Sequence, residues 1–135
     1  MFISQSFLST LFSQAKASPR LRQNYDLRNS EADNSQRMLN ALEPGTVMPI
    51  HRHRKTSESI CMVRGKMVMR LYDDKGNVTD EFVMKPCGEH PMVQVEKGQW
   101  HLLEVLDGRI REPNLNLSKG GEVWRVGAAW KRRAN

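Results

Sequence analysis

The sequence predicts an all-β domain, a small antiparallel barrel or sandwich, preceded by one N-terminal α-helix. Its length of 135 residues suits a single ordinary domain and is too short for two. Residues 2–17 carry apolar side chains at helical spacing. From about residue 37 the chain consists of short apolar segments with Gly, Pro, Asp or Asn between most of them. Segments so short and so evenly separated are typical of antiparallel strands.

The predicted helix covers residues 2–17, where apolar residues recur every three to four positions with Ser and Gln between them. Ser4 is a suitable N-cap, and Ser18 before Pro19 ends the helix because a residue preceding proline disfavours helical dihedral angles. The segment lacks the positive start and unbroken apolar stretch of a secretory signal, although its serine-rich, acid-poor composition is compatible with a transit peptide. We expect residues 1–18 to form a helix on the flank of the domain.

The predicted barrel covers residues 19–107. Its clearest turn is residues 73–77, whose Asp, Gly and Asn residues suit a hairpin. Most of the eight methionines lie in strand-like segments, where they fill a core better than they form a thioether metal site. The segments expected to form strands read MLNALEPG, TVMPIH, ESICMV, KMVMRLYD, EFVMKP, PMVQVEKG and WHLLEVLDG.

Charge is concentrated at the C-terminal end of the chain. Residues 108–135 hold seven of the 21 basic side chains but only two of the 15 acidic ones. The cluster at residues 131–133 could contact nucleic acid, but it has one stacking candidate, Trp130, and no groove-reading motif. We therefore expect residues 108–135 to be a basic extension, partly disordered, and we expect no nucleic-acid partner.

Composition also bears on location. No apolar run approaches the ~20 residues that a membrane-spanning helix needs, so no membrane role is expected. The two cysteines, Cys61 and Cys87, cannot form a disulfide framework, which suits a reducing cytoplasm.

Three histidines and a glutamate form the chemically informative pattern. His51 and His53 lie two residues apart, so on a strand both imidazoles project from one face while Arg52 projects from the other. The polar residues 54–57 can end that strand and begin an antiparallel one, which returns Glu58 to the same interior. His101 follows a turn at the start of another predicted strand.

Imidazoles and a carboxylate that converge in an apolar interior suit a divalent first-row metal: Fe, Mn, Ni, Co or Zn. The alternative is that these histidines are ordinary polar residues near a turn. The joint spacing favours the metal site, with His51, His53, Glu58 and His101 as ligands.

The segment from Gly45 to Gly65 resembles the first cupin motif, G-x5-HxH-x4-E-x6-G, at every position. The second cupin motif is matched in part: Gly98 and His101 fit, whereas Glu96 replaces its proline and Val105 its asparagine. The resemblance implies a double-stranded β-helix, or jelly-roll barrel, with the same four residues as metal ligands. Homodimers are common in the cupin superfamily, so a homodimer is expected.

Residues 5–106 more narrowly resemble the WbuC-type cupin-fold metalloproteins, which are encoded in bacterial surface-polysaccharide gene clusters. The likeness includes the N-terminal helix and the neighbourhoods of Asn24 and Gln36. It implies a small-molecule ligand, most simply a carbohydrate. Candidate residues near such a ligand are Gln36, Arg37, His90 and Trp100; the alternatives are a solvated loop residue for His90 and packing in the barrel wall for Trp100.

Three functions stay open at this point. The first is a metal-dependent isomerase or epimerase acting on a sugar or sugar nucleotide, in which the ion stabilises an enediolate. The second is an Fe(II)-dependent oxygenase, and the third is a carbohydrate-binding or sensing module without catalysis. No catalytic base is evident in the motif.

Overall fold

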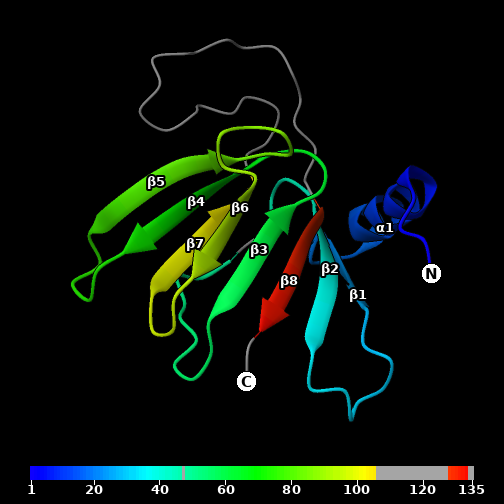
Figure 1. The fold of residues 1–135 in the computed structure, drawn as a ribbon. Coiled ribbons are helices and arrows are strands. Elements are labelled where there is room, and N and C mark those ends of the chain that lie inside the picture. Colours follow the sequence, from blue (N-terminus) through cyan, green and yellow to red (C-terminus); the bar gives the residue numbers. More distant parts are fainter. Residues whose placement is uncertain (47, 106–127, 134–135) are drawn as a thin grey trace.

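The computed structural model describes residues 1–46, 48–105 and 128–133, the last six as backbone only. In these ranges the chain forms one helix and eight strands, arranged in two antiparallel sheets (Figure 1). Buried side chains from both sheets and from the helix form one core cluster. The expected all-β class with an N-terminal helix is therefore confirmed.

The larger sheet has five strands and the smaller has three. In spatial order the larger contains β1 (Arg22–Asp26), β2 (Gln36–Leu42), β8 (Ala128–Arg133), β3 (Glu58–Met62) and β6 (Met92–Val95). The smaller contains β5 (Val78–Met84), β4 (Met67–Tyr72) and β7 (Trp100–Glu104).

The predicted hairpin at residues 73–77 connects β4 to β5. The Asp73 carboxylate accepts hydrogen bonds of 2.9 Å from the backbone N–H groups of Asn77 and Lys75. These bonds, that of Asn77 first, hold the pKa of Asp73 below its usual range. Gly76 has a φ of 85°, a left-handed conformation that glycine adopts without steric cost.

Two segments differ from the sequence expectation. TVMPIH was expected to be a strand, but His51 makes only an isolated bridge there. Pro49 has no backbone N–H to donate to a ladder, which accounts for the interruption. Conversely, the polar sequence RQNYD forms β1, an edge strand that pairs with β2 from Arg22 to Asp26.

The C-terminal end differs from the sequence expectation, because part of it forms the strand β8. The sequence placed residues 108–135 in an extension outside the barrel, yet Ala128–Arg133 pairs with β2 on one side and β3 on the other (Figure 1). Backbone hydrogen bonds in a ladder do not depend on side-chain charge, so a basic run does not exclude a strand. The rest of the expected extension, residues 108–127 and 134–135, lies outside the described residues.

The helix α1 (Gln5–Ala17) begins three residues later than the predicted range but has the predicted capping residues. The Ser4 side chain accepts a hydrogen bond from the backbone N–H of Phe7, and Ser18 is the C-cap. Its buried side chains pack beside β1 and β2, on the flank of the domain as expected. These are Leu8, Leu11, Phe12 and Ala15. No helix in the described part of the chain is long and apolar enough to span a bilayer.

Arg64, in the connection between β3 and β4, links α1 to the larger sheet. Its guanidinium donates to the Ser9 hydroxyl (3.2 Å), to the Gln5 carbonyl (3.0 Å) and to the Gln5 side chain. It also lies 5.3 Å from the centre of the Phe12 ring.

We expect Arg64→Ala to lower the free energy of unfolding by about 1 kcal/mol, because it removes these contacts together. Urea unfolding measures the loss, and hydrogen exchange should show faster exchange in α1. Arg54→Ala, at an exposed position, is the matched control. Unchanged exchange in α1 would contradict the role given to Arg64.

Candidate metal centre

His51 is joined to His101 through the backbone. The His51 N–H donates to the His101 carbonyl (3.1 Å), and the His101 N–H donates to the His51 carbonyl (2.9 Å). Two residues on, the His53 carbonyl accepts a 2.8 Å hydrogen bond from the Gly98 N–H in the turn between β6 and β7. These three bonds attach the 51–53 segment to β7 and its turn.

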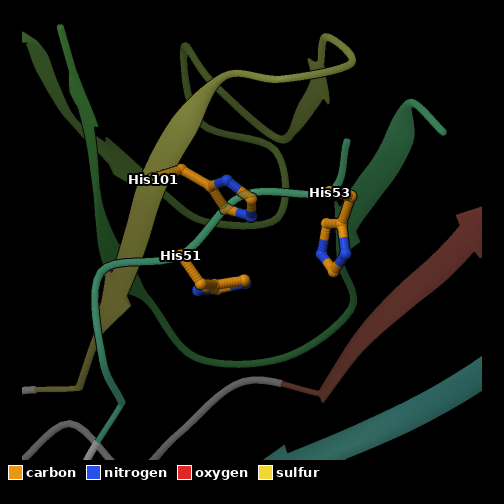
Figure 2. A group of neighbouring side chains, drawn as sticks. All are labelled: His51, His53 and His101. Carbon is orange, nitrogen blue, oxygen red and sulfur yellow. The ribbon is translucent and has the colours of Figure 1, made fainter. Parts of the chain in front are cut away.

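The three imidazoles lie around a common space (Figure 2). The ring centre of His101 is 4.2 Å from that of His51 and 5.6 Å from that of His53. Their candidate ligand nitrogens all lie within 4.8 Å of one another. His101 is 1% exposed, whereas His51 and His53 are half-buried. The group could therefore hold one metal ion.

Backbone carbonyls orient two of the rings. Nδ1 of His51 lies 3.1 Å from the Pro49 carbonyl, and Nδ1 of His101 lies 2.9 Å from the Gln99 carbonyl. A carbonyl only accepts hydrogen bonds, so these contacts favour the tautomer with its proton on Nδ1, which leaves Nε2 as the ligand atom. This is the second contact that metal-binding histidines typically make.

Glu58, at the start of β3, reaches the same space and is 1% exposed. Its carboxylate oxygens lie 2.9 Å from His53 Nε2 and 3.9 Å from His101 Nε2. Ile60 and Met62 share its buried face, as alternation along β3 requires. The structure thus brings together all four residues that the sequence proposed as ligands.

The donor set and its surroundings suit a divalent cation. Leu71 pairs with His101 across the smaller sheet, and the buried Ile60 and Val95 lie near Glu58 in the larger one. Burying a carboxylate among apolar side chains is costly unless an opposite charge compensates it. Nitrogen donors with one oxygen donor fit a first-row transition metal.

Gln36 lies on the face of β2 that corresponds to the Glu58 face. Both residues pair with position 133 of β8, and directly paired residues share a face of a sheet. Gln36 is half-buried. It is therefore on the interior side of the larger sheet, two strands away from Glu58.

Arg37, the next residue, consequently lies on the opposite face. Its guanidinium donates to the carbonyls of Ser35 and Leu27 (3.1 Å each) and to the Asp33 carboxylate (3.3 Å). From the sequence we expected Arg37 near the ligand. In the structure its guanidinium instead contacts the loop that precedes β2. It is not among the residues that converge on the histidines.

Trp100 and His90 also lie away from the histidine group. Trp100 directly precedes His101 on β7 and so projects from the other face, where the Arg52 guanidinium lies 4.4 Å from its ring centre. His90 is exposed, with its ring 4.8 Å from that of Phe82. Neither side chain joins the three converging imidazoles.

The groups that orient the imidazoles, the carbonyls of Pro49 and Gln99, could not be recognised from the sequence. Each belongs to the residue two positions before its histidine. Because every residue has a carbonyl, side-chain types give no signal for such a partner. The shared i−2 spacing becomes recognisable only once the backbone path is known.

Residues 3–84 match a family model described as a domain of unknown function, DUF6016. The chain belongs to the DUF6016 family. The match in this DUF6016 chain runs from the residues before α1 to the end of β5 and includes His51, His53 and Glu58, while His101 follows it. No curated protein sequence matches the chain significantly.

Solved structures share the fold of this DUF6016 chain. The capsular polysaccharide assembling protein CapF from Staphylococcus aureus is 20% identical with a TM-score of 0.58, and the match covers 84% of this chain but 26% of CapF. KdgF from Halomonas sp. is 11% identical with a TM-score of 0.55, covering 87% and 83% of the two chains. An RmlC-like cupin family protein with a double-stranded β-helix fold, from Methanocaldococcus jannaschii, is 15% identical with a TM-score of 0.54, covering 85% and 82%.

Likeness at these identities shows the fold, and the DUF6016 chain has the cupin fold that its first motif predicted. The narrower resemblance to WbuC-type proteins stays a prediction. The DUF6016 chain spans about a quarter of the length of CapF.

Proposed function

We propose that this chain binds one divalent transition metal ion through His51, His53, His101 and Glu58. The observation that carries the proposal is the convergence of three imidazoles, their candidate ligand nitrogens within 4.8 Å of one another, beside the buried Glu58 carboxylate. Iron, manganese, nickel, cobalt and zinc all suit this donor set. When bound, the ion would supply Lewis-acid chemistry at its open coordination positions.

The chain's own residues would prepare the site before a ligand arrives. The carbonyls of Pro49 and Gln99 hold the Nδ1 protons, so His51 and His101 present Nε2 without rearrangement. Glu58 would supply a negative charge in a buried position, where Coulombic attraction is less screened than in water. Such preorganisation favours a site that keeps its geometry while a ligand exchanges.

We further propose that the ligand is a sugar or sugar nucleotide of bacterial surface-polysaccharide metabolism. CapF, whose description concerns capsular polysaccharide assembly, shares the fold, and the WbuC-type resemblance indicates a similar context. Isomerisation or epimerisation is the simplest reaction for this ligand class at a Lewis-acid site. Gln36, on the interior face, is the predicted substrate residue whose position fits this proposal best.

A thermal-shift screen of nucleotide sugars tests the ligand proposal. Ligands that bind only the folded protein stabilise it by RT ln(1 + [L]/Kd), so we expect at least one sugar to raise the Tm of the metal-loaded protein. The same sugar should give a smaller shift without metal. Conversion of that sugar would indicate the isomerase, whereas saturable binding without turnover would indicate the binding module.

Two further results would count against this ligand class. Oxygen uptake by the iron-loaded protein would favour the Fe(II)-dependent oxygenase. If no sugar shifts the Tm of protein that carries one equivalent of metal, the sugar proposal is wrong while the metal site stands.

A further inference from the structure

We propose that Arg52 and Trp100 form a clamp on the outer side of the barrel that holds the imidazoles in position for the metal. This inference rests on the proposed metal site and assigns positioning roles to two residues that do not join the imidazole group. The juxtaposition that supports it is the Arg52 guanidinium, 4.4 Å from the centre of the Trp100 ring.

The two clamp residues are sequence neighbours of the candidate ligands. Arg52 lies between His51 and His53, and Trp100 directly precedes His101. Successive side chains of an extended chain project to opposite sides, so the imidazoles point inward while Arg52 and Trp100 meet behind them. The stack therefore joins, on the outside, the same two segments that carry the three imidazoles inside.

The 51–53 segment belongs to none of the named strands, so individual contacts attach it to the barrel. In the described part of the chain its backbone makes an isolated bridge between His51 and His101 and one further hydrogen bond at His53, and the His53 imidazole lies 2.9 Å from the Glu58 carboxylate. Arg54 and Lys55, which follow, are exposed. A side-chain contact at Arg52 therefore adds substantially to the contacts that hold two of the three imidazoles.

Trp100 is a fixed platform for this contact. The Gln99 side-chain amide donates to the carbonyls of Tyr72 (2.8 Å) and Trp100 (3.0 Å), which holds the start of β7 against β4. Arg52 also lies 3.9 Å from the Asp74 carboxylate, but Asp74 is 88% exposed, and such ion pairs contribute little. The Arg52 side chain is only 26% exposed, so its stacking on the indole is the stronger contact.

The positive charge of Arg52 and its clamp role predict opposite effects of Arg52→Ala on metal affinity. A guanidinium near a bound cation repels it, so on charge alone Arg52→Ala should bind metal more tightly. If Arg52 acts as a clamp, Arg52→Ala should bind metal more weakly, because the 51–53 segment then samples arrangements that do not ligate. Arg54→Ala removes an equal charge two residues away and serves as the matched control.

The experiment measures the Kd for Zn²⁺ by competition with a chelator, using full-length protein. We expect Arg52→Ala to weaken binding about threefold to tenfold, the range of a partly desolvated cation–π contact. Arg54→Ala should bind as tightly as the wild type or slightly more tightly. Arg52→Lys keeps the charge but loses the planar stack, so its affinity should lie between those of the wild type and Arg52→Ala.

A double-mutant cycle and a spectrum separate the clamp from a general loss of stability. If Arg52 and Trp100 act as a pair, Arg52→Ala with Trp100→Ala should weaken binding by less than the product of the single effects. The visible spectrum of the Co²⁺-loaded Arg52→Lys variant should also report altered coordination, while its circular dichroism without metal matches the wild type.

Wild-type affinity in both Arg52 variants, or tighter binding in Arg52→Ala, would overturn the clamp and leave the metal site intact. If the wild-type protein binds no Zn²⁺, the proposed metal site itself fails. The two failures are thus distinguishable in one titration series.

Discussion

Replacing His101 with alanine is expected to abolish stoichiometric metal binding. His101 is the most buried of the three imidazoles, and its ring centre lies 4.2 Å from that of His51 and 5.6 Å from that of His53. Without it, no imidazole from β7 completes the group that the 51–53 segment begins. Elemental analysis after dialysis against trace metal should give about one ion per wild-type chain and almost none for His101→Ala.

One variant serves as a control for this result, and a second tests the carboxylate ligand. His90→Ala should keep its metal, because His90 is exposed and packs against Phe82 rather than against the other imidazoles. Glu58→Gln keeps the size of the side chain but removes its charge, and we expect metal affinity to fall about tenfold or more. Full metal content in His101→Ala, with normal folding, would refute the role of His101.

Removing the metal is expected to have the largest effect on stability. Binding to the folded state alone stabilises it by about 2.7 kcal/mol at a hundredfold excess of free ion over Kd, and by about 4.1 kcal/mol at a thousandfold excess. For a domain of this size that corresponds to a rise in Tm of roughly 10 °C or more. Calorimetry with and without a chelator measures the difference.

The rise in Tm on metal addition should depend on the four candidate ligand residues. His51→Ala should unfold at the same temperature with and without added metal, because it lacks a ligand in the segment attached to β7. An equal metal-dependent shift in His51→Ala and in the wild type would place the ion elsewhere. A wild-type Tm that does not change on metal addition would contradict the site altogether.

The sequence predicted the parts of the fold that depend on local spacing. The helix α1 follows from its apolar repeat and from Ser4 and Ser18 at its ends. The convergence of His51, His53 and Glu58 follows from the spacing of one short motif. His101 could be added because it starts a predicted strand after a turn, and the structure places it at Trp100–Glu104.

The sequence did not predict the parts that depend on strand pairing. β1 is polar and β8 is basic, so neither has the apolar alternation that marks a strand, yet both pair over their full length. The positions of Gln36 and Arg37 illustrate the same limit. Which of two adjacent residues faces the interior depends on the register with β8, and a shift of one residue would exchange them.

Trp100 is next to the candidate ligand His101 in the sequence but lies on the opposite face of the strand. From the sequence, Trp100 was expected either to pack in the barrel wall or to lie near a sugar beside His101, and alternation along β7 places it on the outer side. There it meets Arg52, which the sequence placed outside the interior on the same grounds. Their contact could not be anticipated because it joins segments almost fifty residues apart.

Anomalous diffraction from a crystal of the metal-loaded protein, recorded at the absorption edge of the bound element, locates the bound ion. We predict one peak per chain, within bonding distance of imidazole nitrogens of His51, His53 and His101 and of a Glu58 carboxylate oxygen. A strong peak at any other place, with these four side chains pointing away from it, would contradict the proposed metal centre.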